Sequence, residues 1–172
     1  MNEVLFKTLI LIRCIFPPII FSVFHPFIAM MLDEFVLDGL ISPHHFFIGS
    51  IPEHIKGRHK LKYDLFLDSW GFLTGLLPVL YKGHKFYYVF EKYRILILYL
   101  FVWKIIGSIL VYKYKDYRFT LVFQNFFLAV YLSVGFCDYF NIDSLLRGRI
   151  MAMFIVMFIL REFYLVNVNK TL

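Results

Sequence analysis

The sequence is poor in charged residues and in cysteine. Only 17% of its 172 residues are Asp, Glu, Lys or Arg, whereas 60% are hydrophobic. A soluble domain of this length cannot bury so much apolar surface, because small domains have a large surface relative to their core. The composition therefore excludes an ordinary soluble domain. It predicts an all-α integral membrane protein with a single transmembrane domain over residues 1–172.

Several kinds of site are also missing from the sequence. Cys14 and Cys137 both fall in apolar runs, which argues against a disulfide framework. There is no glycine-rich phosphate loop, no Ser–His–acid arrangement and no cysteine pair for a metal, and the six histidines are too few for the histidine boxes of membrane di-iron oxygenases. The net charge of +6 comes from basic residues spread among short loops, which favours anionic lipid headgroups as partners and predicts no nucleic-acid binding.

Apolar runs occupy most of the chain. A transmembrane helix needs about 20 mostly apolar residues, and about six runs are predicted as spans: 4–24, 27–41, 65–81, 95–112, 119–137 and 150–168. The first run lacks a small-residue cleavage site, so we expect a retained helix and not a signal peptide. Six spans put both termini on one side, and a modest excess of basic residues predicts that this side is cytoplasmic. The connections at 42–62, 82–94 and 138–149 are predicted as polar or interfacial loops.

Five of the twelve carboxylates lie close together in the chain: Asp33, Glu34, Asp38, Asp64 and Asp68. An ionisable side chain inside a bilayer costs roughly 2.5–3.5 kcal/mol on insertion scales, so such a cluster predicts a functional site. Carboxylate oxygens are ligands for hard cations such as Mg²⁺, and paired metal ions stabilise the attacking and leaving oxygens of phosphotransfer. We therefore predict that this stretch binds a divalent cation together with a phosphorylated substrate.

Three short motifs in the first seventy residues belong together. The run from Thr8 to Arg13 is followed by Pro17-Pro18, the pair Asp38-Gly39 follows an apolar run, and Asp64-x-x-x-Asp68 opens the next one. This order resembles the CDP-alcohol phosphatidyltransferases, whose second helix carries Asp-x-x-Asp-Gly and whose third opens with Asp-x-x-x-Asp. The family also has six helices. The resemblance by motif covers about half of the chain.

The spacing of the first acid differs from the family pattern. The family's first aspartate lies three residues before the second, whereas Asp33 lies five residues and Glu34 four residues before Asp38. The family's Ala-Arg pair is replaced by Ser42-Pro43.

The resemblance implies a membrane-embedded phosphotransferase of phospholipid biosynthesis that uses Mg²⁺ or Mn²⁺, a CDP-linked lipid and an alcohol acceptor. It implies the following roles: metal ligands Asp38, Asp64 and one of Asp33 or Glu34, general base Asp68, and close backbone approach at Gly39. Four basic residues between these acids are candidates for contacts with nucleotide or lipid phosphates: Lys56, Arg58, Lys60 and Lys62.

Each of these features has a structural alternative. The acids of 64–68 can cap a helix start, where carboxylates suit the helix dipole. The acids of 33–38 can pair with Arg13, Lys104 or Arg161 as intramembrane ion pairs. The basic cluster of 56–62 can be a topology signal. The alternative function is a non-catalytic helical membrane protein, either a degenerate relative or a small transport or ion-binding component. The sequence leaves open whether two chains form a homodimer.

Overall fold

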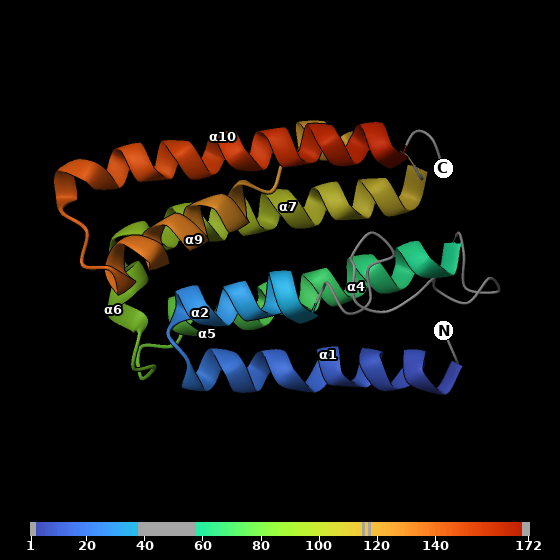
Figure 1. Cartoon of the computed structure of the whole chain (residues 1–172), viewed down its shortest axis with the longest axis horizontal. Helices are drawn as coiled ribbons and strands as arrows, with labels where there is room; N and C mark the ends of the chain where they lie inside the picture. Colours follow the sequence, from blue (N-terminus) through green and yellow to red (C-terminus); the bar gives the residue numbers. More distant parts are fainter. Residues whose placement is uncertain (1–2, 38–57, 115, 117, 170–172) are drawn as a thin grey trace. The chain divides into compact units, whose positions relative to one another are not determined.

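The structure is a computed structural model that describes residues 3–37, 58–114, 116 and 118–169. All regular structure in these residues is helical, which confirms the all-α prediction for the described part of the chain (Figure 1). The chain divides into two compact units, Met1–Phe86 and Tyr87–Leu172. Each unit is described by itself below.

The first unit contains three helical rods. Its elements are α1 (Glu3–Val23), α2 (Pro26–Met31), the π-helix η1 (Leu32–Leu37), α4 (Arg58–Gly75) and α5 (Leu77–Leu80). α1 continues through Pro17 and Pro18. His25 caps α2 by accepting a hydrogen bond from the backbone N–H of Phe27 (3.3 Å), with Pro26 at the first helical position, where its missing N–H is not needed.

The contacts within this unit fix the directions of the rods. Trp70 Nε1 donates a hydrogen bond to the carbonyl of Cys14 (2.9 Å), and Gly75 lies against Phe21 and Met30. Because residue numbers rise together along the α1–α4 contact, these two helices are parallel, and α2 runs antiparallel to both. A glycine at position 75 allows this approach, since a Cβ there would lie 2.9 Å from Met30.

The segment after α5 folds back onto the end of α1. His84 Nε2 contacts the carbonyl oxygen of Phe21 (3.0 Å), and Lys85 Nζ donates a hydrogen bond to the carbonyl of Val23. Both groups satisfy carbonyls at the C-terminal end of α1, which a helix leaves without intrahelical partners. Phe86 lies against both histidines of this corner, with ring centroids 5.0 Å from His25 and 5.9 Å from His84.

The second unit is built around α9. Its elements are α6 (Tyr87–Phe90), the 3₁₀-helix η3 (Glu91–Tyr93), α7 (Arg94–Tyr114), α8 (Phe119–Val122), α9 (Phe126–Tyr139) and α10 (Ser144–Asn169). Ten of the fourteen residues of α9 are buried, and Tyr131 packs on Phe90 and Phe127 with ring centroids 4.4 and 5.6 Å away. α9 packs against α6, α7 and α10.

The turn between α9 and α10 is a Schellman motif. Asn141 has a positive φ of 50°, a conformation that asparagine tolerates better than most residues. The N–H of Ile142 donates to the carbonyl of Cys137 (2.8 Å), and the N–H of Asn141 donates to that of Asp138 (3.1 Å). These bonds satisfy the last carbonyls of α9. The loop predicted over 138–149 is therefore shorter than expected, because α9 extends to Tyr139 and α10 begins at Ser144.

The apolar runs predicted as spans correspond to helical regions, but three of them are interrupted. The run at 27–41 changes from α2 to a π-helix, the run at 65–81 breaks between α4 and α5, and the run at 119–137 breaks between α8 and α9. Among the described residues, one continuous helical stretch is long and apolar enough to cross a membrane, Tyr87–Tyr114.

Candidate functional site

The candidate site lies on the contact of α1 and η1 with α4, within the first unit. Arg13 Nη2 on α1 donates a hydrogen bond to Asp68 Oδ1 on α4 over 3.4 Å. Arg13 is 3% exposed and Asp68 is 34% exposed. A buried guanidinium is costly without a compensating negative charge, so this pair explains how α1 tolerates an arginine in its apolar run.

Asp33 approaches the same helix from η1. Its side chain is 2% exposed and lies against Gly71, one turn after Asp68 on α4. An ideal Cβ on Gly71 would lie 2.1 Å from Asp33 Oδ2, so the absence of a side chain at position 71 provides the space for this carboxylate. The hydroxyl of Thr74 donates to the carbonyl of Gly71 (2.8 Å) on the same part of α4.

The π-helix η1 buries a second acid beside the first. Glu34 is 8% exposed, whereas Phe35 and Val36, which follow it, are about half exposed. π-helical segments are rare and frequently occur at functional sites. Two adjacent carboxylates on the buried side of such a segment are therefore a feature that packing alone does not require.

The remaining predicted residues are described in part or not at all. Asp38, Gly39 and Lys56 lie outside the described residues. The backbone of four others forms the first turns of α4, and their side chains lie outside the described part: Arg58, Lys60, Lys62 and Asp64. The basic cluster was predicted in a connection between helices, and the structure places its last three members in α4 instead. Asp64 lies four residues before Asp68, a spacing that places both on one face of the helix.

The described carboxylates provide hard oxygen donors but do not form a complete cage. No group of three or more His, Cys, Asp or Glu side chains converges on one point among the described residues. The structure brings Asp33 to Gly71, one turn from Asp68 on α4, and pairs Asp68 with Arg13. Carboxylate oxygens fit Mg²⁺ or Mn²⁺, which usually keep waters and substrate phosphates among their ligands.

Two residues of this site were missed by the sequence analysis. The sequence analysis gave no role to Gly71 or Trp70. Gly71 leaves space for the Asp33 carboxylate, and Trp70 on α4 donates a hydrogen bond to α1. Gly71 and Gly75 are four residues apart on one helix face, and this spacing of small residues could have indicated close helix contact. The structure pairs Arg13 with Asp68, and its predicted pairing with the acids of 33–38 stays a prediction.

Comparisons of the chain with models of protein families, with curated proteins and with solved structures found no match.

Proposed function

We propose that this protein is a membrane-embedded phosphotransferase of the CDP-alcohol type that depends on Mg²⁺ or Mn²⁺. The observation that supports the proposal most is the approach of Asp33 to Gly71, one turn from Asp68 on α4. These two acids come from the two segments that resemble the aspartate motifs of the family. The Asp33 carboxylate is buried, and it occupies space that a side chain at position 71 would fill.

The altered spacing of the first motif is compatible with this proposal. The stretch from Leu32 to Leu37 is π-helical, and hydrogen bonds in a π-helix join residues five apart and not four. Asp33 lies in this stretch, and in the sequence it precedes Asp38 by five residues and not by three. A wider helical turn is one way to keep an acid on the inner face although its position in the sequence has shifted.

The metal, when bound, would supply positive charge for the phosphate oxygens and lower the barrier to displacement. The residues proposed to hold it are Asp33, Asp38 and Asp64, with Glu34 adjacent to Asp33. The basic residues of 56–62 are proposed to contact the phosphates of the substrate.

Asp68 is proposed as the general base. It would accept the proton of the acceptor hydroxyl while the hydroxyl oxygen forms a new bond to phosphorus and CMP leaves with the electrons of the broken bond. Among the three acids of the candidate site whose side chains are described (Asp33, Glu34 and Asp68), Asp68 is the most exposed, at 34%, so a substrate hydroxyl could reach it. Arg13 would hold its carboxylate and compensate its charge.

The membrane setting is part of the same proposal. We propose that the six helical regions form a transmembrane bundle with both termini in the cytoplasm, and that a homodimer is compatible with the exposed apolar helix faces. Tyr87–Tyr114 meets the length and hydropathy required of a span.

A second candidate is a non-catalytic helical membrane protein. The pairing of Asp68 with Arg13 favours it, because a paired acid can be structural only. In the first candidate Asp68 takes part in catalysis, whereas in the second it only stabilises the contact between α1 and α4.

Release of CMP from CDP-diacylglycerol with a panel of small alcohols tests the proposal. The purified protein in nanodiscs should release CMP only with Mg²⁺ or Mn²⁺. Asp68→Asn should lower the rate by about 100-fold or more, where 100-fold is the lower end of the usual contribution of a general base, and Asp33→Asn should lower it as well because it removes a proposed metal ligand. Asp143→Asn is the matched control, because Asp143 is an exposed acid of the other unit. Absence of metal-dependent release with every alcohol, or equal rates for Asp68→Asn and wild type, would refute the proposal.

A further inference from the structure

The predicted span over 119–137 is divided by a sharp turn in the second unit. α8 ends at Val122, and α9 begins at Phe126. The N–H of Phe126 donates to the carbonyl of Gln124 (2.7 Å), and Asn125 has φ −76° and ψ 54°, which together make an inverse γ-turn. Asn125 then caps α9, because its Oδ1 accepts a hydrogen bond from Leu128 N (3.2 Å). We call residues 123–125 the α8–α9 break.

Lys104 lies at the level of this break on α7. Phe101 of α7 packs on Phe127 (5.6 Å between ring centroids), and Trp103 packs on Phe123 (4.6 Å). These two contacts bracket the break, and Lys104 follows Trp103 directly. Lys104 is also seven residues from both Ile97 and Val111, which are fully buried, so it lies on the inner face of α7.

Glu162 lies at the same level on α10. Phe136 of α9 packs on Phe154 of α10 (5.9 Å), and the two helices are antiparallel. Roughly two turns further along each helix, this register places Glu162 beside the first turn of α9. Glu162 is 4% exposed, between Phe158 at 3% and Val166 at 2%, so these three residues form the buried face of α10.

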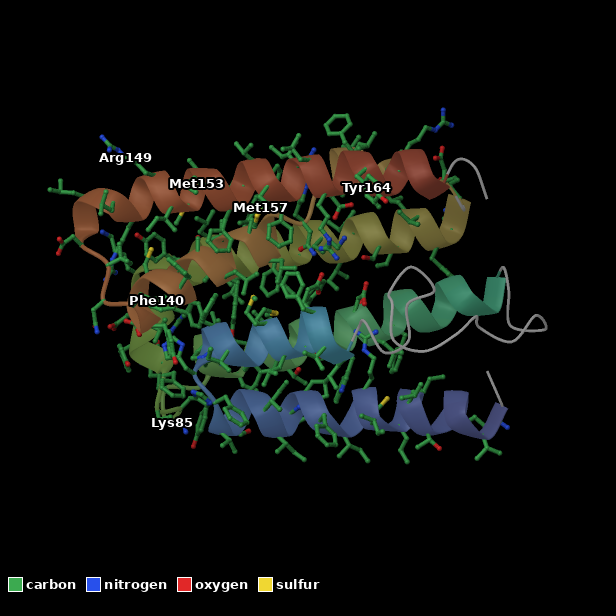
Figure 2. The ribbon with its side chains drawn as sticks, in the orientation of Figure 1. Lys85, Phe140, Arg149, Met153, Met157 and Tyr164 are labelled. Atoms are coloured by element: carbon green, nitrogen blue, oxygen red, sulfur yellow. The ribbon has the colours of Figure 1, made fainter. Side chains whose placement is uncertain are left out.

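The opposite face of α10 is apolar and exposed. Met153, Met157 and Tyr164, labelled in Figure 2, are 70%, 54% and 68% exposed. The one acid of this helix is therefore on its buried face, whereas its exposed face carries large apolar side chains. This is the reverse of the usual arrangement for a helix at a water-exposed surface.

Glu162 takes part in no hydrogen bond or ion pair within the part of the chain that the structure describes. Burial of a carboxylate without a partner is costly, and ionisable residues inside membrane helices commonly mark ion or substrate pathways. Arg161, the adjacent base, directs its guanidinium over the ring of Phe158, 5.6 Å from the centroid. The carboxylate therefore lacks a described counter-ion.

The break carries further oxygen atoms at the level that the helix register assigns to Glu162. α8 ends at the break, and of its four carbonyls that of Phe119 accepts a hydrogen bond from the N–H of Phe123 (2.8 Å), so the carbonyls that follow it are the candidate donors. Gln124 adds an amide oxygen. In discontinuous transmembrane helices, unwound carbonyls coordinate small cations. Such oxygen donors, without sulfur or imidazole, suit hard cations.

We propose that Glu162 and the α8–α9 break form a binding site for a monovalent cation, Na⁺ or K⁺. A single carboxylate supplies one negative charge, and Lys104 of α7 lies at the same level of the unit, so we propose a monovalent and not a divalent cation. The site lies in the second unit and is independent of the proposed phosphotransfer.

Thermal unfolding of the full chain in nanodiscs tests the proposal without any enzymatic assay. The unfolding midpoint is measured in NaCl, KCl and N-methylglucamine chloride at constant ionic strength. Wild type should show a saturable rise in Na⁺ or K⁺ over N-methylglucamine, and Glu162→Gln should lose it. Glu91→Gln, at an exposed acid of the same unit, should keep it.

The Lys104→Met variant distinguishes a cation site at Glu162 from an ion pair between Lys104 and Glu162 that only stabilises the fold. Removal of a nearby positive charge should tighten cation binding by about tenfold, seen as a lower half-saturating concentration. Equal midpoints in all three salts for wild type would overturn the proposal. So would a Lys104→Met protein that is destabilised in every salt without tighter binding. Because wild type and Lys104→Met each give a decisive result, the test remains valid if Glu162→Gln does not fold.

Discussion

Asp33 lies against Gly71 so closely that a Cβ at position 71 would be 2.1 Å from Asp33 Oδ2. The contact joins η1 to α4 and depends on the absence of a side chain. It gives the first of four predictions.

Gly71→Ala should destabilise the protein by about 1–3 kcal/mol, the usual cost of overpacking a helix contact. The added methyl group would displace the Asp33 carboxylate or separate η1 from α4. Thermal or denaturant unfolding in detergent measures the effect. The control is Gly148→Ala in α10, where a Cβ would meet nothing within 4 Å and alanine should stabilise the helix by about 1 kcal/mol. Similar changes at the two positions would contradict the contact.

Arg13 and Asp68 should show a favourable coupling energy in a double-mutant cycle. Because Asp68 is 34% exposed, solvent screens the pair, and we expect a coupling of about 1 kcal/mol and not the larger values of fully buried pairs. The cycle uses Arg13→Met, Asp68→Asn and the double variant, with unfolding free energy as the measurement. Additive effects would show that the two side chains do not stabilise each other.

Trp70→Phe should lower stability by about 0.5–1.5 kcal/mol, because it removes one hydrogen bond and keeps most of the ring. The lost bond is that from Trp70 Nε1 to the carbonyl of Cys14. Trp103→Phe is the matched variant, since Trp103 packs on Phe123 through its ring. A larger loss for Trp103→Phe than for Trp70→Phe would argue against the role of the Trp70 hydrogen bond.

Asn125→Ala should cost about 0.5–2 kcal/mol, the range for loss of an N-cap. The substitution leaves the N–H of Leu128 without its side-chain acceptor at a position where Asn125 is 3% exposed. Gln124→Ala, at the preceding residue, should change stability less. Unfolding of both variants in detergent gives the comparison, and a smaller effect for Asn125→Ala than for Gln124→Ala would contradict the capping role.

The helical character of the chain could be predicted from its apolar runs, because length and composition alone distinguish them from loops. The breaks could not be predicted from hydropathy. Phe123 in the α8–α9 break and Phe126 directly after it are as apolar as the helices that they adjoin. The interruption depends on the Asn125 cap and on the packing of Phe123 against Gly107, where a Cβ would lie 2.2 Å from Phe123 Cβ. Hydropathy does not detect a cap or a glycine contact.

The acids of the candidate site could be identified from the sequence because carboxylates are rare in the apolar runs. Their partners could not, because pairing depends on helix direction. Arg13 meets Asp68, on a helix more than fifty residues away, because α1 and α4 are parallel, and no local pattern specifies that arrangement. The roles of Asp33, Glu34, Asp38, Asp64 and Asp68 stay predictions.

The α8–α9 break also bears on how the second unit would enter a bilayer. α9 has 14 residues and would span only about 21 Å, less than the hydrocarbon thickness of about 30 Å. Neither half of the divided segment is therefore a stop-transfer sequence by itself. Because Phe101 and Trp103 of α7 pack on Phe127 and Phe123 at either end of the break, insertion of this segment into a bilayer would be expected to be concerted with α7.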